Sequence, residues 1–198
     1  MVTGIIVSRG IKSTPYQSPD VTISKPTIII IPEYKKPDEK KYKKGLKLVT
    51  VNIIRGPKNV QDPQINSLSK LNCILACIEA SKKGADEGLM LDINNNIATN
   101  NSTHFFYIKN KTVFTSTGKF CVTGITRKKI IEICKFNKIK VKEKNFKLKD
   151  VMNADEAFAT GTFGGVVPIN KINNKKFPIK KNNLTFKILN LYNQLINQ

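Results

Sequence analysis

The sequence is poor in acidic residues and histidine and lacks long apolar runs, and these shortages exclude several classes of protein. Its longest apolar run, residues 27–31, is far shorter than the roughly 20 residues that a membrane helix requires. Met1 leads directly into an apolar, β-branched segment without a basic stretch, so no signal peptide is predicted. We therefore expect a cytoplasmic protein that does not enter a membrane.

Cysteine and histidine are too scattered to predict a metal site. The cysteines are Cys73, Cys77, Cys121 and Cys134, and the single histidine is His104. Cys73 and Cys77 share one face of a predicted helix, but a zinc site needs further ligands at close spacing. We therefore predict reduced, buried thiols and no metal.

The shortage of acidic residues leaves a large positive charge. The chain has 34 lysines and arginines against 14 acidic residues, a formal net charge of +20. Charge of this size can indicate a nucleic-acid partner. The basic residues, however, are nearly all lysine and are mixed with many asparagines and isoleucines, as AT-biased coding would produce. No helix-turn-helix spacing, zinc finger or aromatic RNA-binding strand accompanies them, so nucleic-acid binding is not expected.

The chain does contain many short strands and a few amphipathic helices, which predicts an α+β fold. Apolar residues recur at helical spacing from Leu68 and predict a helix over residues 68–83, ended by Gly84. Thr126 is a suitable N-cap for a second helix to residue 136, and residues 184–196 predict a third. Strands are predicted over residues 4–7, 27–31, 46–53, 88–92, 104–109, 112–115, 139–141, 157–160 and 166–169. The strand over residues 27–31 should be buried, because its isoleucines form an unbroken run.

Several motifs follow one another in a characteristic order. Residues 84–92 read GADEGLMLD, residues 124–127 read GITR, and residues 154–162 read ADEAFATGT. Upstream, residues 7–10 read VSRG. In this order and at these spacings, the motifs resemble those of the pyridoxal-phosphate-dependent class IV aminotransferases, and most of all the branched-chain amino acid type.

This resemblance implies a fold and a domain organisation. The fold is the strand-rich pseudobarrel of the family's C-terminal domain, with packing helices, over residues 56–198. Residues 1–55 would be a remnant of the N-terminal domain and the interdomain junction. The rest of the small N-terminal domain, which ordinarily supplies an arginine for the cofactor phosphate, is expected to be missing. A homodimer is also expected.

The resemblance further implies which residues should carry the chemistry. Residues 62–68 read DPQINSL, where the family has a proline, a strand end that bears a lysine, and then a helix, so the Schiff-base lysine falls on Asn66. We expect Asn66 to lie at a strand end and to face the same cavity as Thr126 and Thr162. The glutamate that faces the pyridine nitrogen falls on Thr99. An asparagine cannot form an imine, and a neutral threonine cannot hold a proton on the pyridine nitrogen. Lys70 is the nearby substitute, but its place in the predicted helix should direct its ammonium elsewhere. Covalent attachment of the cofactor is therefore doubtful.

The residues for the cofactor phosphate match the family. Ile125 and Thr126 open a predicted helix, where free N–H groups attract an anion, and Thr162 lies in a turn that offers a hydroxyl and an amide. Thr126 could equally be only an N-cap.

The resemblance implies transfer of an amino group from branched-chain amino acids to 2-oxoglutarate, with catalysis impaired or lost. Aminodeoxychorismate lyases and D-amino acid aminotransferases share the motifs and remain alternatives. Two alternatives outside enzyme function are a non-catalytic interaction partner and a degenerate gene product.

Overall fold

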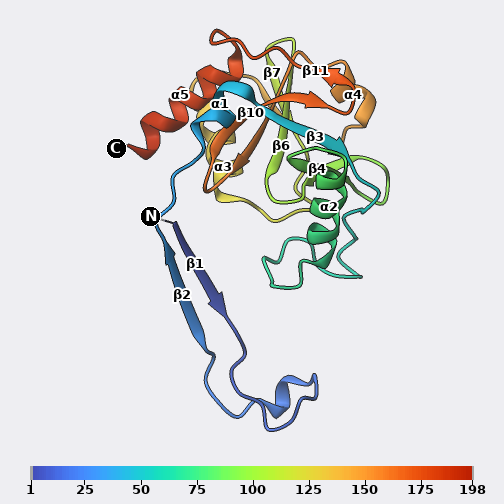
Figure 1. Cartoon of the computed structure of the whole chain (residues 1–198), viewed down its shortest axis with the longest axis vertical. Coiled ribbons are helices and arrows are strands. Elements are labelled where there is room, and N and C mark those ends of the chain that lie inside the picture. The colour runs from blue at the N-terminus through green and yellow to red at the C-terminus, as the bar shows by residue number, and fades with distance from the viewer. Residues whose placement is uncertain (1, 198) are drawn as a thin grey trace. The chain divides into compact units, whose positions relative to one another are not determined.

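The computed structural model describes residues 2–197 and divides the chain into two compact units, Met1–Pro37 and Asp38–Gln198 (Figure 1). The predicted division between residues 55 and 56 concerns the family's domains and stays a prediction. In the structure, residues 38–55 lie within the second unit.

The first unit is built on an antiparallel pair of strands. β1 (Val2–Val7) pairs with β2 (Ile28–Glu33), and Ile5 lies opposite Ile30. The long connection between them contains one 3-10 turn, η1 (Pro19–Val21). Every residue of β2 is exposed within the structure, although the run of isoleucines had predicted a buried strand.

The second unit contains a nine-stranded mixed sheet. Its strands are β3 (Leu46–Thr50), β4 (Glu87–Leu91), β5 (Ile97–Asn100), β6 (His104–Lys109), β7 (Thr112–Thr115), β8 (Val141–Glu143), β9 (Glu156–Gly161), β10 (Gly165–Ile172) and β11 (Lys175–Lys176). They lie in the order β5-β4-β3-β10-β9-β6-β7-β8, and β11 pairs with β10. β3 runs parallel to β4 and β10, and the sheet curls into a half-barrel.

β6 is buried on both faces of the sheet, in keeping with its unbroken apolar run. Phe105 and Tyr107 pack in one core with Phe146 and with residues of β3 and β10. Phe106 and Ile108 point the other way and pack beneath α3 (Ile125–Phe136) and α5 (Leu184–Ile196). Successive residues of a strand point to opposite faces, which explains this division.

Three further helices complete the second unit: α1 (Glu39–Lys44), α2 (Leu71–Lys82) and α4 (Leu148–Met152). α2 lies against β3 and β4, where Ala76 and Ala80 pack on Val51 and Met90. Among residues 2–197, no helix is long and apolar enough to cross a membrane.

The structure confirms most predicted elements and corrects several boundaries. The strands over residues 104–109 and 112–115 are as predicted, and positive φ angles at Asn110 and Lys111 form their turn. The helix predicted from Leu68 begins at Leu71, and the N-cap of α3 is Gly124 rather than Thr126. The strand predicted over residues 139–141 lies at Val141–Glu143, because Lys138 turns the chain with a positive φ. β5 was not predicted.

Candidate functional site

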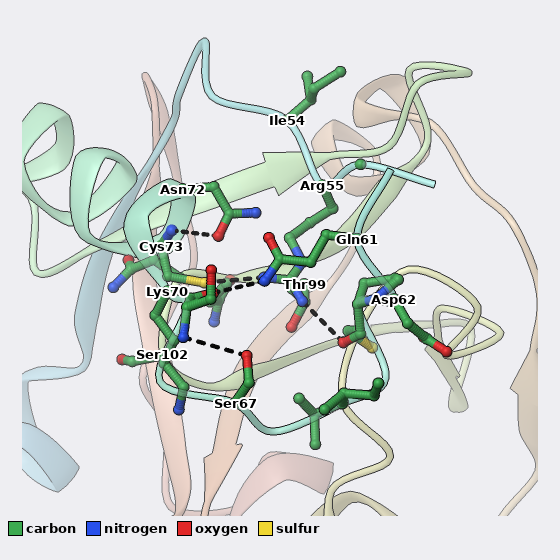
Figure 2. Close-up of a pocket in the computed structure, with 18 of the residues that line it drawn as sticks. Ile54, Arg55, Gln61, Asp62, Ser67, Lys70, Asn72, Cys73, Thr99 and Ser102 are labelled. Carbon is green, nitrogen blue, oxygen red and sulfur yellow. Dashed lines mark hydrogen bonds between the residues drawn. The ribbon is translucent and has the colours of Figure 1, made fainter. Parts of the chain in front are cut away.

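A cavity of about 750 Å³ lies beside the start of α2 (Figure 2). Four segments build most of its wall: the loop of residues 54–63, the irregular residues 65–70 with the first turns of α2, residues 99–104 from the end of β5 to the start of β6, and residues 121–122. Ile93 also lines it. All of these residues belong to the second unit, so the cavity is formed within one compact part of the chain.

Arg55 lies in the wall of the cavity and reaches from its loop toward Cys73 at the start of α2 (Figure 2). Its backbone is fixed because its N–H donates to the Leu91 carbonyl at the end of β4. Its guanidinium is buried and donates to the Phe120 carbonyl at 3.0 Å, the Pro63 carbonyl at 3.1 Å and the Cys73 Sγ at 3.0 Å. Arg55 therefore joins three segments of the wall.

Thr99 lies on β5 and is buried in the wall of the cavity. Its Oγ1 donates to the Thr103 carbonyl at 2.9 Å, so the hydroxyl closes the loop of residues 99–103. The Asn101 Oδ1 accepts from the Gly88 N–H at 2.6 Å and ties this loop to β4. Thr99, at the expected glutamate position, thus carries no charge and holds this loop together through a hydrogen bond.

Glu87, at the start of β4, fixes the other end of the same loop. Its carboxylate accepts from the Ser102 Oγ at 3.0 Å and the Thr103 Oγ1 at 2.7 Å. Burial raises the pKa of the Glu87 carboxyl, and the bonds from Thr103 and Ser102 oppose that rise. Glu87 belongs to the GADE motif, but the motif alone did not assign it to the site.

His104 connects the cavity to the start of α3. Its Nε2 lies 2.7 Å from the Val122 carbonyl, and a Cβ built on Gly124 would lie only 2.3 Å from its ring. In the sheet, His104 lies opposite Thr160, just before the turn that contains Thr162. Burial lowers the pKa of His104, with further lowering by Arg127 and Arg55, so the ring is neutral near pH 7.

The predicted phosphate residues lie on two different elements of the second unit. Ile125 and Thr126 are the first residues of α3; Thr126 is buried, whereas Ile125 is exposed. Thr162 is exposed in the turn between β9 and β10. Of the residues that the structure describes, the cavity wall includes none of these three. His104 and Thr103 lie between them and the cavity, since a Cβ on Gly161 would contact the Thr103 methyl at 3.4 Å.

Asn66 and Lys70 differ from expectation. Asn66 is exposed in an irregular segment rather than at a strand end, and its neighbours Ile65 and Ser67 line the cavity. Lys70 is the N-cap residue of α2 and lines the cavity, because the helix begins three residues later than predicted. The expectation that Lys70 lies inside the helix is therefore wrong, whereas the direction of its ammonium stays a prediction. That Asn66 shares a cavity with Thr126 and Thr162 stays a prediction.

Cysteines that are distant in sequence also come together here. Cys73, Cys77 and Cys121 all line the cavity with His104. No group of three or more His, Cys, Asp or Glu among residues 2–197 is arranged to hold a metal ion. Cys121 is buried, and this burial raises its thiol pKa, but Cys77 is exposed, which corrects the prediction that all the thiols are buried.

Comparison with known proteins gives one consistent result. The family model described as Amino-transferase class IV matches residues 3–172. Branched-chain-amino-acid aminotransferase-like protein 2 of Arabidopsis thaliana is 32% identical over 169 residues, which cover 85% of this chain and 30% of that protein. The chain therefore spans less than a third of this curated relative.

Solved structures agree with this match. The branched-chain aminotransferase of Thermoproteus uzoniensis, in a structure with norvaline, superposes with a TM-score of 0.81 at 25% identity, over 93% of this chain and 62% of that one. A putative 4-amino-4-deoxychorismate lyase from Legionella pneumophila gives a TM-score of 0.83 at 24% identity, over 97% and 69% of the two chains. At that identity the second match concerns the fold alone, and together they confirm the expected fold class.

Proposed function

Because this chain belongs to the class IV aminotransferase family, we propose that it is a branched-chain amino acid aminotransferase-like protein whose transamination is impaired or lost. The observation that carries the proposal is Asn66 at the position that the motifs assign to the Schiff-base lysine. The amino acceptor of the ancestral reaction would be 2-oxoglutarate.

The start of α3 fits the phosphate of pyridoxal phosphate. The first N–H groups of a helix have no partner within it and favour an anion, and Ile125 and Thr126 supply two of them. The buried Thr160 Oγ1 has no hydrogen-bond partner among the described residues, and its strand leads into the turn that contains Thr162. We propose that these residues hold the phosphate reversibly.

The other end of the site does not fit the cofactor. Pyridoxal phosphate supplies an electron sink for the carbanion at an amino acid's Cα, provided that a lysine attaches it and a carboxylate keeps its ring protonated. The Asn66 amide has no basic nitrogen with which to attach it or to take a proton. The Thr99 hydroxyl donates to the Thr103 carbonyl and carries no charge. Loss of a positioned general base costs on the order of 10²–10⁴-fold in rate.

Lys70 bears on how much of the catalysis is lost. It lines the cavity at the N-cap of α2, four residues beyond Asn66, and is the lysine best placed to substitute for the missing base. Its side chain is exposed rather than enclosed by the wall, so we expect no stable attachment of the cofactor.

We also propose a homodimer. The apolar residues of α2 that repeat at helical spacing are exposed, namely Leu71, Ile74, Leu75 and Ile78. A second copy of the chain that packs on this face would bury them, as large apolar side chains at subunit interfaces usually are.

The first experiment tests attachment. Purified protein is mixed with pyridoxal phosphate, reduced with borohydride and mapped by mass spectrometry. We expect no modified lysine at a stoichiometry near one per chain, and reversible binding by equilibrium dialysis. A stoichiometric adduct on Lys70 would instead make Lys70 the functional substitute and overturn the proposed loss of catalysis.

The second experiment restores the missing group. Asn66→Lys and the size-matched control Asn66→Gln are assayed for 2-oxoacid formation from leucine, isoleucine and valine. We expect a gain of about 10²-fold or more in Asn66→Lys alone, because only a lysine restores attachment and proton transfer. If neither variant gains activity while both still bind pyridoxal phosphate, the chain is a non-catalytic binding protein.

A further inference from the structure

Arg55 has unused hydrogen-bonding capacity inside the cavity. Its side chain is only 7% exposed and lines the cavity wall. A guanidinium has five N–H donors, and three of them donate to the Phe120 carbonyl, the Pro63 carbonyl and the Cys73 sulfur. Two of the three acceptors are backbone carbonyls, and two donors remain for a ligand.

The charge of Arg55 is also unbalanced. Within residues 2–197, no aspartate or glutamate forms an ion pair with it. Asp62 lines the same cavity, but its carboxylate pairs with Lys58 at 3.3 Å and accepts from the Gln64 N–H. Arg127, the other buried arginine, does have a carboxylate, Glu143, at 2.7 Å. A buried charge without a partner is costly, so the cavity favours an anion beside Arg55.

The composition of the chain supports this inference. Among 34 basic residues, the arginines are only Arg9, Arg55 and Arg127, and all the others are lysine. Arg55 and Arg127 are both buried, and both lower the pKa of His104 after the larger effect of burial. A guanidinium recognises carboxylates through a planar fork that lysine lacks. Two of the three arginines are thus buried, and at Arg55 the fork already holds three acceptors of the wall at once.

We propose that Arg55 binds a small carboxylate in this cavity, independently of any phosphate site at the start of α3. A monoanion matches the single unpaired charge of Arg55, whereas a phosphate dianion would exceed it.

The chain's few arginines make the test direct. The whole ¹⁵N-labelled protein, free of pyridoxal phosphate, has Nε–Hε resonances from Arg9, Arg55 and Arg127 alone. Arg9→Lys identifies the first by its loss, and Cys73→Ser shifts the Arg55 resonance because it changes the acceptor at one terminal nitrogen. Acetate, glycolate and inorganic phosphate are then titrated at constant ionic strength, with chloride as the replacement anion.

We expect the Arg55 resonance to shift saturably with acetate and with glycolate, with midpoints of about 1 mM. Arg9→Lys, the matched substitution in the other unit, should leave both midpoints unchanged, whereas Arg55→Lys should weaken acetate binding about 10-fold or more by calorimetry.

Other results would overturn the proposal. They are a shift that grows linearly with acetate, an equal shift with chloride, tighter binding of phosphate than of acetate, or loss of binding in Lys70→Gln but not in Arg55→Lys. If Arg55→Lys does not fold, the titration of the unsubstituted protein still decides the question. Because no pyridoxal phosphate is present, failure here leaves the proposed aminotransferase-like function untouched.

Discussion

The helices α3 and α2 both cover the sheet of the second unit, but they do so in different ways. α3 packs large side chains such as Ile130 against Phe158 and Phe106 of the strands beneath it. α2 instead rests on β4 through Ala76 and Ala80 and exposes its leucines and isoleucines. The densely packed helix provides a rigid start for the candidate phosphate site, and the loosely covered region beside α2 contains the cavity.

This difference shows that an apolar helix face need not be the buried face. In α2 the small residues make the contact, because they allow the helix backbone to approach β4 closely. A Cβ built on Gly88 would lie only 3.0 Å from the Ala76 carbonyl. Small contact residues fill little space, which is consistent with a cavity of about 750 Å³ beside the same helix.

The largest loss of stability is expected for a substitution in the core where α3 covers the sheet. Phe158 is fully buried and stacks on Phe106 with ring centroids 4.9 Å apart. Phe158→Ala should lower the free energy of unfolding by about 3–5 kcal/mol, because it removes this packing and leaves a cavity. Chemical denaturation of the whole chain measures the loss. Phe136→Ala is the control: Phe136 is 88% exposed at the end of the same helix, so an equal loss there would contradict the dense packing.

A smaller effect is expected at the junction of α3 and the cavity. An Ala Cβ at position 124 would clash with His104, which would have to move toward the cavity and lose its contact with the Val122 carbonyl. Gly124→Ala should therefore cost about 1–3 kcal/mol of unfolding free energy. Gly56→Ala is the matched control, because its nearest neighbour would be Val60 at 3.9 Å. Comparable losses in both variants would show that His104 is not held in this position.

The pH dependence of stability tests the loop that faces the cavity. Burial raises the pKa of Glu87 above its ordinary value, so the folded chain binds more protons than the unfolded one between those two pKa values. Glu87 therefore makes the chain less stable as pH rises through this window and favours folding below it. Glu87→Gln should remove this contribution, so its thermal unfolding midpoint should gain less on acidification from pH 7 than that of the natural chain.

Glu132→Gln is a control that should change the pH dependence of stability in the opposite direction. Its hydrogen bond with Lys129 lowers the pKa of Glu132, so any contribution from Glu132 is lost as pH falls. If the Glu87→Gln and Glu132→Gln variants change the pH profile in the same direction, the loop of residues 99–103 is not held by a buried carboxyl.

The sequence predicted the elements where local pattern and packing agree. In β6 every residue of the run Phe105–Ile108 is buried, and the strand predicted over residues 104–109 has the range that the structure shows. α5 matches its predicted range because its apolar residues face the core at helical spacing. For α2, periodicity identified the helix but not which face was covered, because coverage depends on the approach of β4.

The site was less predictable than the fold. The motifs located Thr99 and the start of α3, but they contained no information about Arg55, whose role comes from contacts with residues 8, 18 and 65 positions away. The scarcity of arginine in a lysine-rich chain was the available indication. Lys70 was misplaced because the helix was extended to Leu68, whereas the chain remains irregular until Leu71.

The smallest effect on stability is expected for a substitution on the exposed face of α2. It tests most directly whether α2 and α3 pack on the sheet in different ways. Leu71 is 67% exposed, so Leu71→Gln should change the unfolding free energy of the isolated chain by no more than about 0.5 kcal/mol. Denaturation at low protein concentration measures this value, and sedimentation at high concentration tests the proposed homodimer. If the dimer uses this face, Leu71→Gln should weaken it, while the matched control Lys82→Gln, at the end of α2, should not. A loss above about 1 kcal/mol at low concentration would mean that Leu71 is already covered within one chain. In that case α2 would be packed on both sides, and its difference from α3 would disappear.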